Sequence, residues 1–87
     1  MTKEELFQLT EVEGNEIEFK YQNKWYSITY WEYEINKYGF SFCEFYQKPV
    51  DVYSFDELIS IKYNGVTVME MLESLDEDAE KRGDLIY

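Results

Sequence analysis

Histidine is absent from this sequence of 87 residues, and cysteine and proline occur once each. Without histidine the chain lacks the commonest general base and the commonest metal ligand, which excludes Ser-His-Asp and Cys-His catalytic arrangements. The four glycines lie at positions 14, 39, 65 and 83, too far apart to form a glycine-rich phosphate loop. These absences predict that the protein is not an enzyme and holds no cofactor.

The single cysteine, Cys43, excludes an internal disulfide bond and a cysteine-based zinc site. Cys43 lies between Phe42 and Glu44 in a segment that we expect to be a strand, with no cluster of cations nearby to activate it as a nucleophile. A small buried side chain is therefore the favoured interpretation of Cys43.

Carboxylates are plentiful, but none belongs to a complete metal-binding or catalytic motif. Asp76, Asp78 and Glu80 have the spacing of the first ligands of a calcium loop. The sixth position of that loop requires glycine and is Lys81, and the twelfth requires glutamate and is Tyr87. With nineteen acidic residues, neighbouring pairs of carboxylates also arise by chance. We therefore expect a solvated helix surface here and no metal.

Long apolar runs are missing as well. No stretch of about 18 apolar residues is present to span a bilayer, and the N-terminal Met-Thr-Lys-Glu-Glu lacks the apolar core of a signal peptide. A chain of this length has room for one domain with one core. The expectation is a single acidic domain over residues 1–87, located in the cytoplasm.

Aromatic residues make up 20% of the chain, and twelve of the seventeen lie between Phe19 and Tyr46. Residues 16–21 alternate polar and apolar side chains, which is typical of a half-buried strand. Residues 25–35 and 40–46 are rich in aromatic and β-branched side chains, which favour strands. This stretch therefore predicts three consecutive strands.

The connections between these strands are short. Residues 22–24 and 36–39 leave no room for a crossover, so the strands are predicted to be antiparallel, with Gly39 at positive φ in the second turn. Residues 50–53 are a candidate fourth strand, and Asn64-Gly65 is the strongest tight-turn dipeptide of the chain.

Three capping boxes predict the starts of helices at Thr2, Ser54 and Thr67, each followed three residues later by glutamate. The main helix is predicted from Thr67 to Arg82. Its apolar stripe consists of Val68, Met71, Leu72 and Leu75. The sequence thus predicts an α+β fold: a three- to four-stranded antiparallel meander, a C-terminal helix packed on one face, and a short N-terminal helix.

Both faces of the strand over residues 25–35 carry aromatic side chains. Trp25, Trp31 and Tyr33 share one face, while Tyr26 and Tyr30 share the other. One interpretation is that helices cover one face and a partner meets Trp25, Trp31 and Tyr33 on the other. The alternative is that tyrosine tolerates half-exposure and that these rings have no partner.

Nineteen acidic and eight basic residues give a net charge of −11. Such a charge repels nucleic acid and anionic membranes, since affinity for phosphate comes from lysine and arginine. It attracts basic protein surfaces and accelerates encounter with them. The sequence therefore predicts a basic protein as partner, with no direct binding to nucleic acid or membrane.

The acids of the predicted C-terminal helix recur three or four residues apart, and such a row can imitate the phosphates of a nucleic acid. A charge of about 2–8 suffices to keep a small domain in solution, so −11 is an excess. The alternative is that these charges serve only to solvate the surface. The candidate partner-binding acids are Glu70, Glu73, Asp76, Glu77, Asp78 and Glu80, with Glu32 and Glu34 as a second set.

Three segments resemble small acidic proteins encoded by phages and integrated elements of Gram-positive bacteria. These are Ile17-x-Phe19-x-Tyr21-x-x-Lys24-x-Tyr26-x-Ile28, then residues 53–59 (Tyr-Ser-Phe-Asp-Glu-Leu-Ile), then residues 64–70 (Asn-Gly-Val-Thr-Val-Met-Glu). The resemblance covers roughly residues 16–75, and its motifs are structural, so it assigns no functional residue. Such phage proteins include inhibitors of host nucleic-acid enzymes, among them anti-CRISPR proteins and DNA mimics. The resemblance implies the cytoplasm of a bacterial host as the location.

Two functions follow as hypotheses. The first is a non-enzymatic inhibitor that uses its acidic surface to occupy the nucleic-acid-binding groove of a host defence or nucleic-acid enzyme. The second is a phage structural or assembly adaptor that binds a partner, or a second copy of itself as a homodimer, through Trp25, Trp31 and Tyr33. Salt should weaken the first interaction and have little effect on the second.

Overall fold

The computed structural model describes all residues 1–87 and has an α+β fold, as the sequence predicts. Its main sheet has five antiparallel strands in the order β4-β3-β2-β1-β7. These strands are β1 (Ile17–Tyr21), β2 (Lys24–Glu34), β3 (Lys37–Glu44), β4 (Val50–Val52) and β7 (Leu85–Ile86), and a separate two-stranded ribbon pairs β5 (Lys62–Tyr63) with β6 (Val66–Thr67). The helical segments are α1 (Lys3–Phe7), a π-helical turn η1 (Gln8–Val12), α2 (Phe55–Ser60), α3 (Val68–Glu73) and α4 (Ala79–Arg82).

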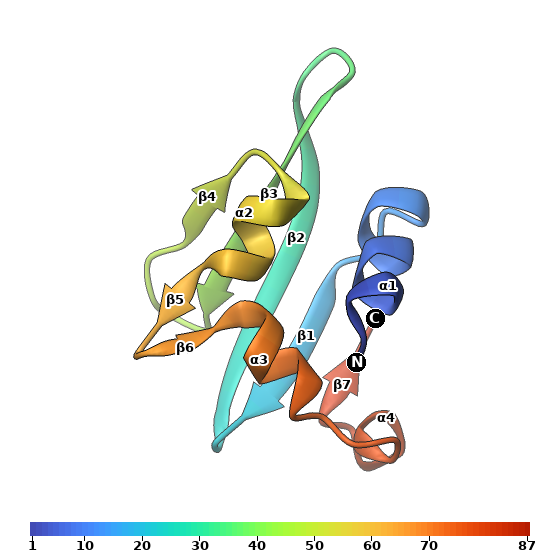
Figure 1. Ribbon diagram of the computed structural model, residues 1–87, viewed down its shortest axis with the longest axis vertical. Helices are drawn as coiled ribbons and strands as arrows, with labels where there is room; N and C mark the ends of the chain where they lie inside the picture. The colour runs from blue at the N-terminus through green and yellow to red at the C-terminus, as the bar shows by residue number, and fades with distance from the viewer.

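The meander β1-β2-β3-β4 and the short N-terminal helix agree with the sequence prediction. The fifth strand, β7, extends the predicted three to four strands, because the C-terminal residues pair with β1. Leu85 lies opposite Phe19 and Ile86 opposite Glu18 in this ladder. The backbone N–H of Lys20 also donates to the carbonyl of Asp84 at 2.8 Å. Residues near the C-terminus therefore form the edge strand of the sheet beside β1 (Figure 1).

The predicted turns between strands form, but in one of them the residue with positive φ was predicted wrongly. Asn64 and Gly65 both have positive φ, at 52° and 84°, as a two-residue hairpin turn between β5 and β6 requires. Between β2 and β3 the prediction was wrong about Gly39. The residue with positive φ there is Asn36, at 61°, whereas Gly39 is buried within β3. Asparagine tolerates the left-handed region, so it can replace glycine in this turn.

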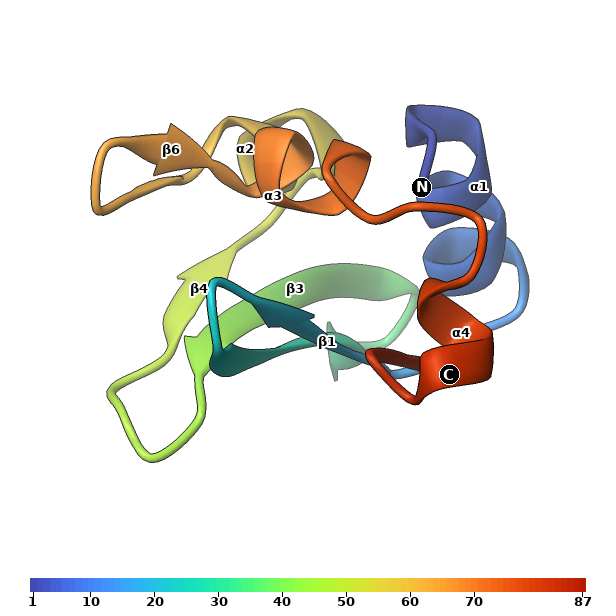
Figure 2. The same cartoon turned by 90° about the horizontal axis from the view of Figure 1, so that it is seen from below.

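The hydrophobic core lies on one face of the sheet, between the strands and the helices. Its strand residues follow the period of two that the sequence shows in residues 16–21. The fully buried cluster contains Ile17, Phe19, Tyr26, Ile28, Phe40 and Phe42 from the strands, and Leu6, Leu58, Val68, Met71 and Leu72 from the helices. Figure 2 shows α1, α2 and α3 on this same side of the sheet and no helix on the opposite side. We call that opposite side the open face.

The single helix predicted from Thr67 to Arg82 does not form, so its packing across the sheet is not confirmed. The chain forms α3, which ends at Glu73, and then α4, which begins at Ala79. Ser74 ends α3, because its hydroxyl donates to the carbonyl of Met71 at 2.6 Å and competes with the next helical turn. The carboxylate of Asp76 then accepts from the backbone N–H of Asp78 at 3.0 Å and turns the chain toward α4.

Two of the three predicted capping boxes form completely. Thr2 with Glu5 caps α1, and Thr67 with Glu70 caps α3, each by a reciprocal pair of backbone-to-side-chain bonds. At α2, Ser54 accepts from the N–H of Glu57, but the Glu57 carboxylate accepts from the Ser54 hydroxyl and the N–H of Tyr53. The short helices of this fold thus begin where local hydrogen bonding predicts.

Candidate functional site

The two ends of the chain lie close together beside α1 (Figure 1), and acidic residues from both ends line one hollow there. The positively charged α-amino group of Met1 donates to the carbonyl of Leu72 at 2.9 Å, which holds the start of the chain against the end of α3. A hollow of about 350 Å³ lies between these segments. Its acidic lining residues are Glu5, Asp76, Glu77 and Glu80, and no lysine or arginine lines it.

Two further acids lie beside this hollow. Glu4 lines a neighbouring depression together with Glu5, and Glu73 lines another together with Glu4 and Lys3. We call the whole set, Glu4, Glu5, Glu73, Asp76, Glu77 and Glu80, the acidic end. Four of its six members are among the candidate residues that the sequence indicates, and the sequence analysis missed Glu4 and Glu5.

The remaining candidate acids lie elsewhere or have local roles. Glu70 caps α3 through its bond to the N–H of Thr67, at 3.0 Å, and this bond lowers the pKa of Glu70. Asp78 precedes α4 without lining the hollow. Glu32 and Glu34 lie at the tip of the β2–β3 hairpin, at the opposite end of the long axis from α4 (Figure 1). The structure therefore does not unite the two predicted acidic sets.

The hairpin-tip acids are engaged in the turn itself. Glu34 forms an ion pair with Lys37 at 3.1 Å, and the carboxylate of Glu32 accepts from the backbone N–H of Asn36 at 2.9 Å. Both carboxylates have a structural explanation that needs no partner.

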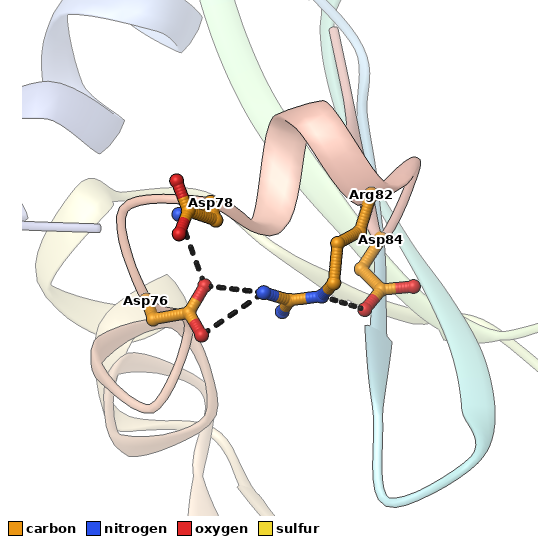
Figure 3. A network of polar contacts seen from close by, with 4 residues as sticks. All are labelled: Asp76, Asp78, Arg82 and Asp84. Atoms are coloured by element: carbon orange, nitrogen blue, oxygen red, sulfur yellow. Dashed lines mark hydrogen bonds and ion pairs between the residues drawn. The ribbon is translucent and has the colours of Figure 1, made fainter.

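Within the acidic end, Asp76 is the most constrained carboxylate (Figure 3). Arg82 donates to both of its oxygens from Nη1, at 2.8 and 3.0 Å, and donates from Nε to Asp84 at 3.1 Å. The hydrogen bonds from Arg82 lower the pKa of Asp76, and those to Asp76 and Asp84 raise the pKa of Arg82. Arg82 therefore compensates part of the negative charge and fixes the geometry of the Asp76–Asp84 segment.

The other carboxylates of the acidic end differ in the internal hydrogen bonds that they form. The hydroxyl of Tyr87 donates to Glu80 at 2.8 Å, and this bond raises the pKa of Tyr87. Glu5 accepts from the N–H of Thr2 at 3.1 Å, which lowers the pKa of Glu5. Glu73 and Glu77 form no hydrogen bond or ion pair and are exposed. Glu4 is likewise exposed without a side-chain bond, so a partner reaches Glu4, Glu73 and Glu77 at no cost in internal bonds.

The aromatic candidates lie on the open face, in two separate clusters. Trp31 contacts Tyr33 edge-on with ring centroids 5.6 Å apart, and both rings contact Tyr53, at 6.3 and 5.0 Å. Tyr33 and Tyr53 are 40% and 55% exposed. The structure thus brings Trp31 and Tyr33 together and adds Tyr53, which the sequence analysis did not single out.

Trp25 belongs to the second cluster. Its ring lies 6.1 Å from that of Phe45, and Phe45 lies 6.2 Å from Tyr46. These three rings line a hollow of about 420 Å³ together with Ile86. We call it the Trp25 hollow. The predicted aromatic set is therefore divided between the two clusters.

Cys43 is half-buried, and its thiol donates to the carbonyls of Glu44 and Gln47 at 3.0 and 3.1 Å, so it supports the turn after β3. No group of three or more histidine, cysteine, aspartate or glutamate side chains has an arrangement suited to a metal ion. None of the helices has the length and hydropathy that crossing a membrane requires.

No protein-family model matches this chain, and comparison with curated proteins and with solved structures finds no significant match. The resemblance to small phage proteins therefore stays a prediction. Any functional conclusion must depend on the two surfaces described above.

Proposed function

We propose that this protein is a non-enzymatic inhibitor that binds the basic, nucleic-acid-binding groove of another protein with its acidic end. The supporting observation is the meeting of α1 with the C-terminal segment. This meeting places carboxylates from both ends of the chain around one hollow that no lysine or arginine lines, so that four carboxylates face the single positive charge of the Met1 α-amino group.

The electrostatic argument has two parts. Clustered negative charges on a folded body raise the encounter rate with a basic surface, and they repel free nucleic acid. The same charges repel one another in the free protein, and a basic partner relieves that repulsion. Glu4, Glu73 and Glu77 contribute most to this binding, because they form no internal bonds that the partner must replace.

The test is capture of proteins from a bacterial lysate on the immobilised protein at low salt, with duplex DNA as competitor. We expect nucleic-acid-binding proteins to be retained and to be released by duplex DNA or by salt. Glu73→Lys/Glu77→Lys should abolish this retention. Glu32→Lys/Glu34→Lys makes the same change in net charge at the hairpin tip and should preserve it. Retention of no nucleic-acid-binding protein, or equal loss in both double variants, contradicts the proposal.

A second candidate function is favoured by the bare open face. The cluster of Trp31, Tyr33 and Tyr53 lies on the side of the sheet that no helix covers. An assembly adaptor would use this cluster against a partner or a second copy of the chain. Binding that persists at high salt and is lost in Trp31→Ala, but not in Glu73→Lys/Glu77→Lys, would select this function over inhibition. Analytical ultracentrifugation of the same variants tests the homodimer.

A further inference from the structure

The Trp25 hollow lies on the open face, at the end of the sheet where the turn before β2 meets the connection after β3. Trp25 and Glu18 belong to neighbouring strands and face the same side, since Lys20 is opposite Trp25 and Ser27 is opposite Glu18 in the β1–β2 ladder. Ile86 extends the hollow from β7. The backbone N–H of Phe45 donates to the carbonyl of Trp25 at 2.9 Å and fixes the wall of the hollow.

Tyr46 is the unusual member of this wall. Its side chain is 99% exposed, and its backbone has φ +68°, in the left-handed region that favours glycine. A residue other than glycine pays about 1–2 kcal/mol for this conformation, and the Tyr46 ring gains almost no burial in return. The fold alone therefore does not explain a tyrosine here, whereas a ligand packed against the ring would.

The charged groups of the hollow are few. Glu18 is half-buried and forms no hydrogen bond or ion pair, so its carboxylate is available. Glu44 also lines the hollow, but its carboxylate already accepts from the hydroxyl of Tyr63 at 2.8 Å. Lys24 is the single base in the lining and has no carboxylate within 4.0 Å.

We propose that the Trp25 hollow binds an arginine side chain of a partner protein, with the guanidinium against the Trp25, Phe45 and Tyr46 rings and paired with Glu18. Aromatic faces attract cations, and a planar guanidinium combines stacking with bidentate pairing to a carboxylate. The net charge of −11 favours a cation over a neutral or anionic group. This site is separate from the acidic end and does not depend on the proposed inhibition.

The test uses Nα-acetyl-arginine methylamide as the probe and the corresponding citrulline derivative as its neutral counterpart. In NMR titrations we expect saturable shifts of the Trp25 indole N–H and of the Phe45 and Tyr46 amides with the arginine probe. The citrulline probe should give none of these shifts, because it keeps the planar shape but lacks the charge.

Three variants make the assignment specific. Tyr46→Gly removes the ring and relieves the strained backbone, so it keeps the fold and should lower the affinity about threefold or more. Glu18→Gln breaks no internal bond and should lower the affinity for the arginine probe by a similar factor. Lys24→Ala should raise this affinity, because it removes a competing cation. Tyr33→Ser changes the other aromatic cluster and should leave the affinity unchanged.

The proposal is overturned if the two probes shift the same resonances equally, or if the arginine probe produces no saturable shift at Trp25. It is also overturned if the largest shifts fall on Glu77 and Glu80, or if Tyr46→Gly and Glu18→Gln both bind as the wild type does. These outcomes are independent of lysate capture, which tests the acidic end alone.

Discussion

Gly39 lies directly opposite Trp31 in the β2–β3 ladder, and the absence of its side chain lets the neighbouring strand and rings approach. A Cβ at position 39 would lie 2.9 Å from the carbonyl oxygen of Val52, 3.3 Å from Tyr53 Cδ1 and 3.6 Å from Trp31 Cζ2. The first of these contacts is with backbone, which cannot rotate away. Gly39 is therefore required by close approach to β4.

Gly39→Ala should lower the free energy of unfolding by about 1–3 kcal/mol, because the methyl group must displace β4 or the Trp31 cluster. The measurement is urea unfolding followed by tryptophan fluorescence. Gly14→Ala is the control, since its added Cβ meets nothing within 4 Å although its φ is +70°. Both variants should lose stability, but only Gly39→Ala should change the emission of folded Trp31. An unchanged unfolding midpoint for Gly39→Ala would show that β4 moves aside freely.

Ser41 connects three strands on the open face. The indole N–H of Trp31 donates to its hydroxyl at 3.0 Å, and that hydroxyl donates to the carboxylate of Asp51. Ser41→Ala should cost about 1 kcal/mol of stability and move the Trp31 indole N–H resonance, because both bonds are lost. Ser27→Ala, on the same face of β2 without a side-chain bond, is the matched control. If the two variants behave alike, the Trp31–Ser41–Asp51 chain contributes nothing.

The Asp76–Arg82 pair predicts a pH dependence. The pKa of Asp76 lies below its ordinary value of 3.8, mainly because Arg82 donates to the carboxylate. A lowered folded-state pKa means that the bond stabilises the fold fully above the unfolded-state pKa and that this stability is lost as pH falls through the folded-state pKa. The difference in unfolding free energy between wild type and Asp76→Asn should therefore be constant at neutral pH and shrink below about pH 4.

Unfolding by urea across this pH range measures that difference. Asp56→Asn is the control, because Asp56 forms no hydrogen bond or ion pair. Protonation of the other carboxylates in acid reduces their mutual repulsion and raises the stability of every variant. Comparing each variant with the wild type at the same pH cancels this shared effect. A difference for Asp76→Asn that grows in acid would contradict the role assigned to Arg82.

The acidic end should store repulsion in the free protein. Glu73→Lys/Glu77→Lys should raise the free energy of unfolding by about 0.2–1 kcal/mol at low salt, since it replaces two exposed carboxylates of the cluster by cations that attract the remaining ones. The gain should fall in about 1 M salt, where the Debye length is about 3 Å. Thermal unfolding at the two salt concentrations measures it. A double variant less stable than the wild type at low salt would mean that these acids are not crowded.

Much of the fold was predictable from short stretches of sequence. The alternation of residues 16–21 predicted β1 with Ile17 and Phe19 on the core face, and both are fully buried. The predictions failed where another interaction outweighed the local conformational preference of the chain. The stripe from Val68 to Leu75 predicted one long helix, but the side chains of Ser74 and Asp76 offered the backbone other partners. Gly39 looked like a turn residue because its contact with β4 is invisible in the sequence.

The acidic end was half predictable for a related reason. The sequence indicated Glu73, Asp76, Glu77 and Glu80 as acids of one helix, which does not form. Tertiary packing brings these four acids together instead, and nothing in the sequence placed Glu4 and Glu5 beside them. One signal could have suggested that the N-terminal acids lie there. The capped N-terminal helix and the C-terminal tail both carry apolar residues, and each must bury them against another part of the chain.

The sequence by itself determined β1 to β4, the Asn64-Gly65 turn and the starts of α1, α2 and α3, because these depend on backbone sterics, side-chain alternation and hydrogen bonds within a few residues. It also determined the charge and the absence of histidine. Only the tertiary structure decided that one face of the sheet stays bare, that the chain ends unite their carboxylates, and that Trp25 and Trp31 belong to different clusters. Those outcomes depend on which distant segments bury apolar surface against one another, and pairing of β7 with β1 has no short-range signature.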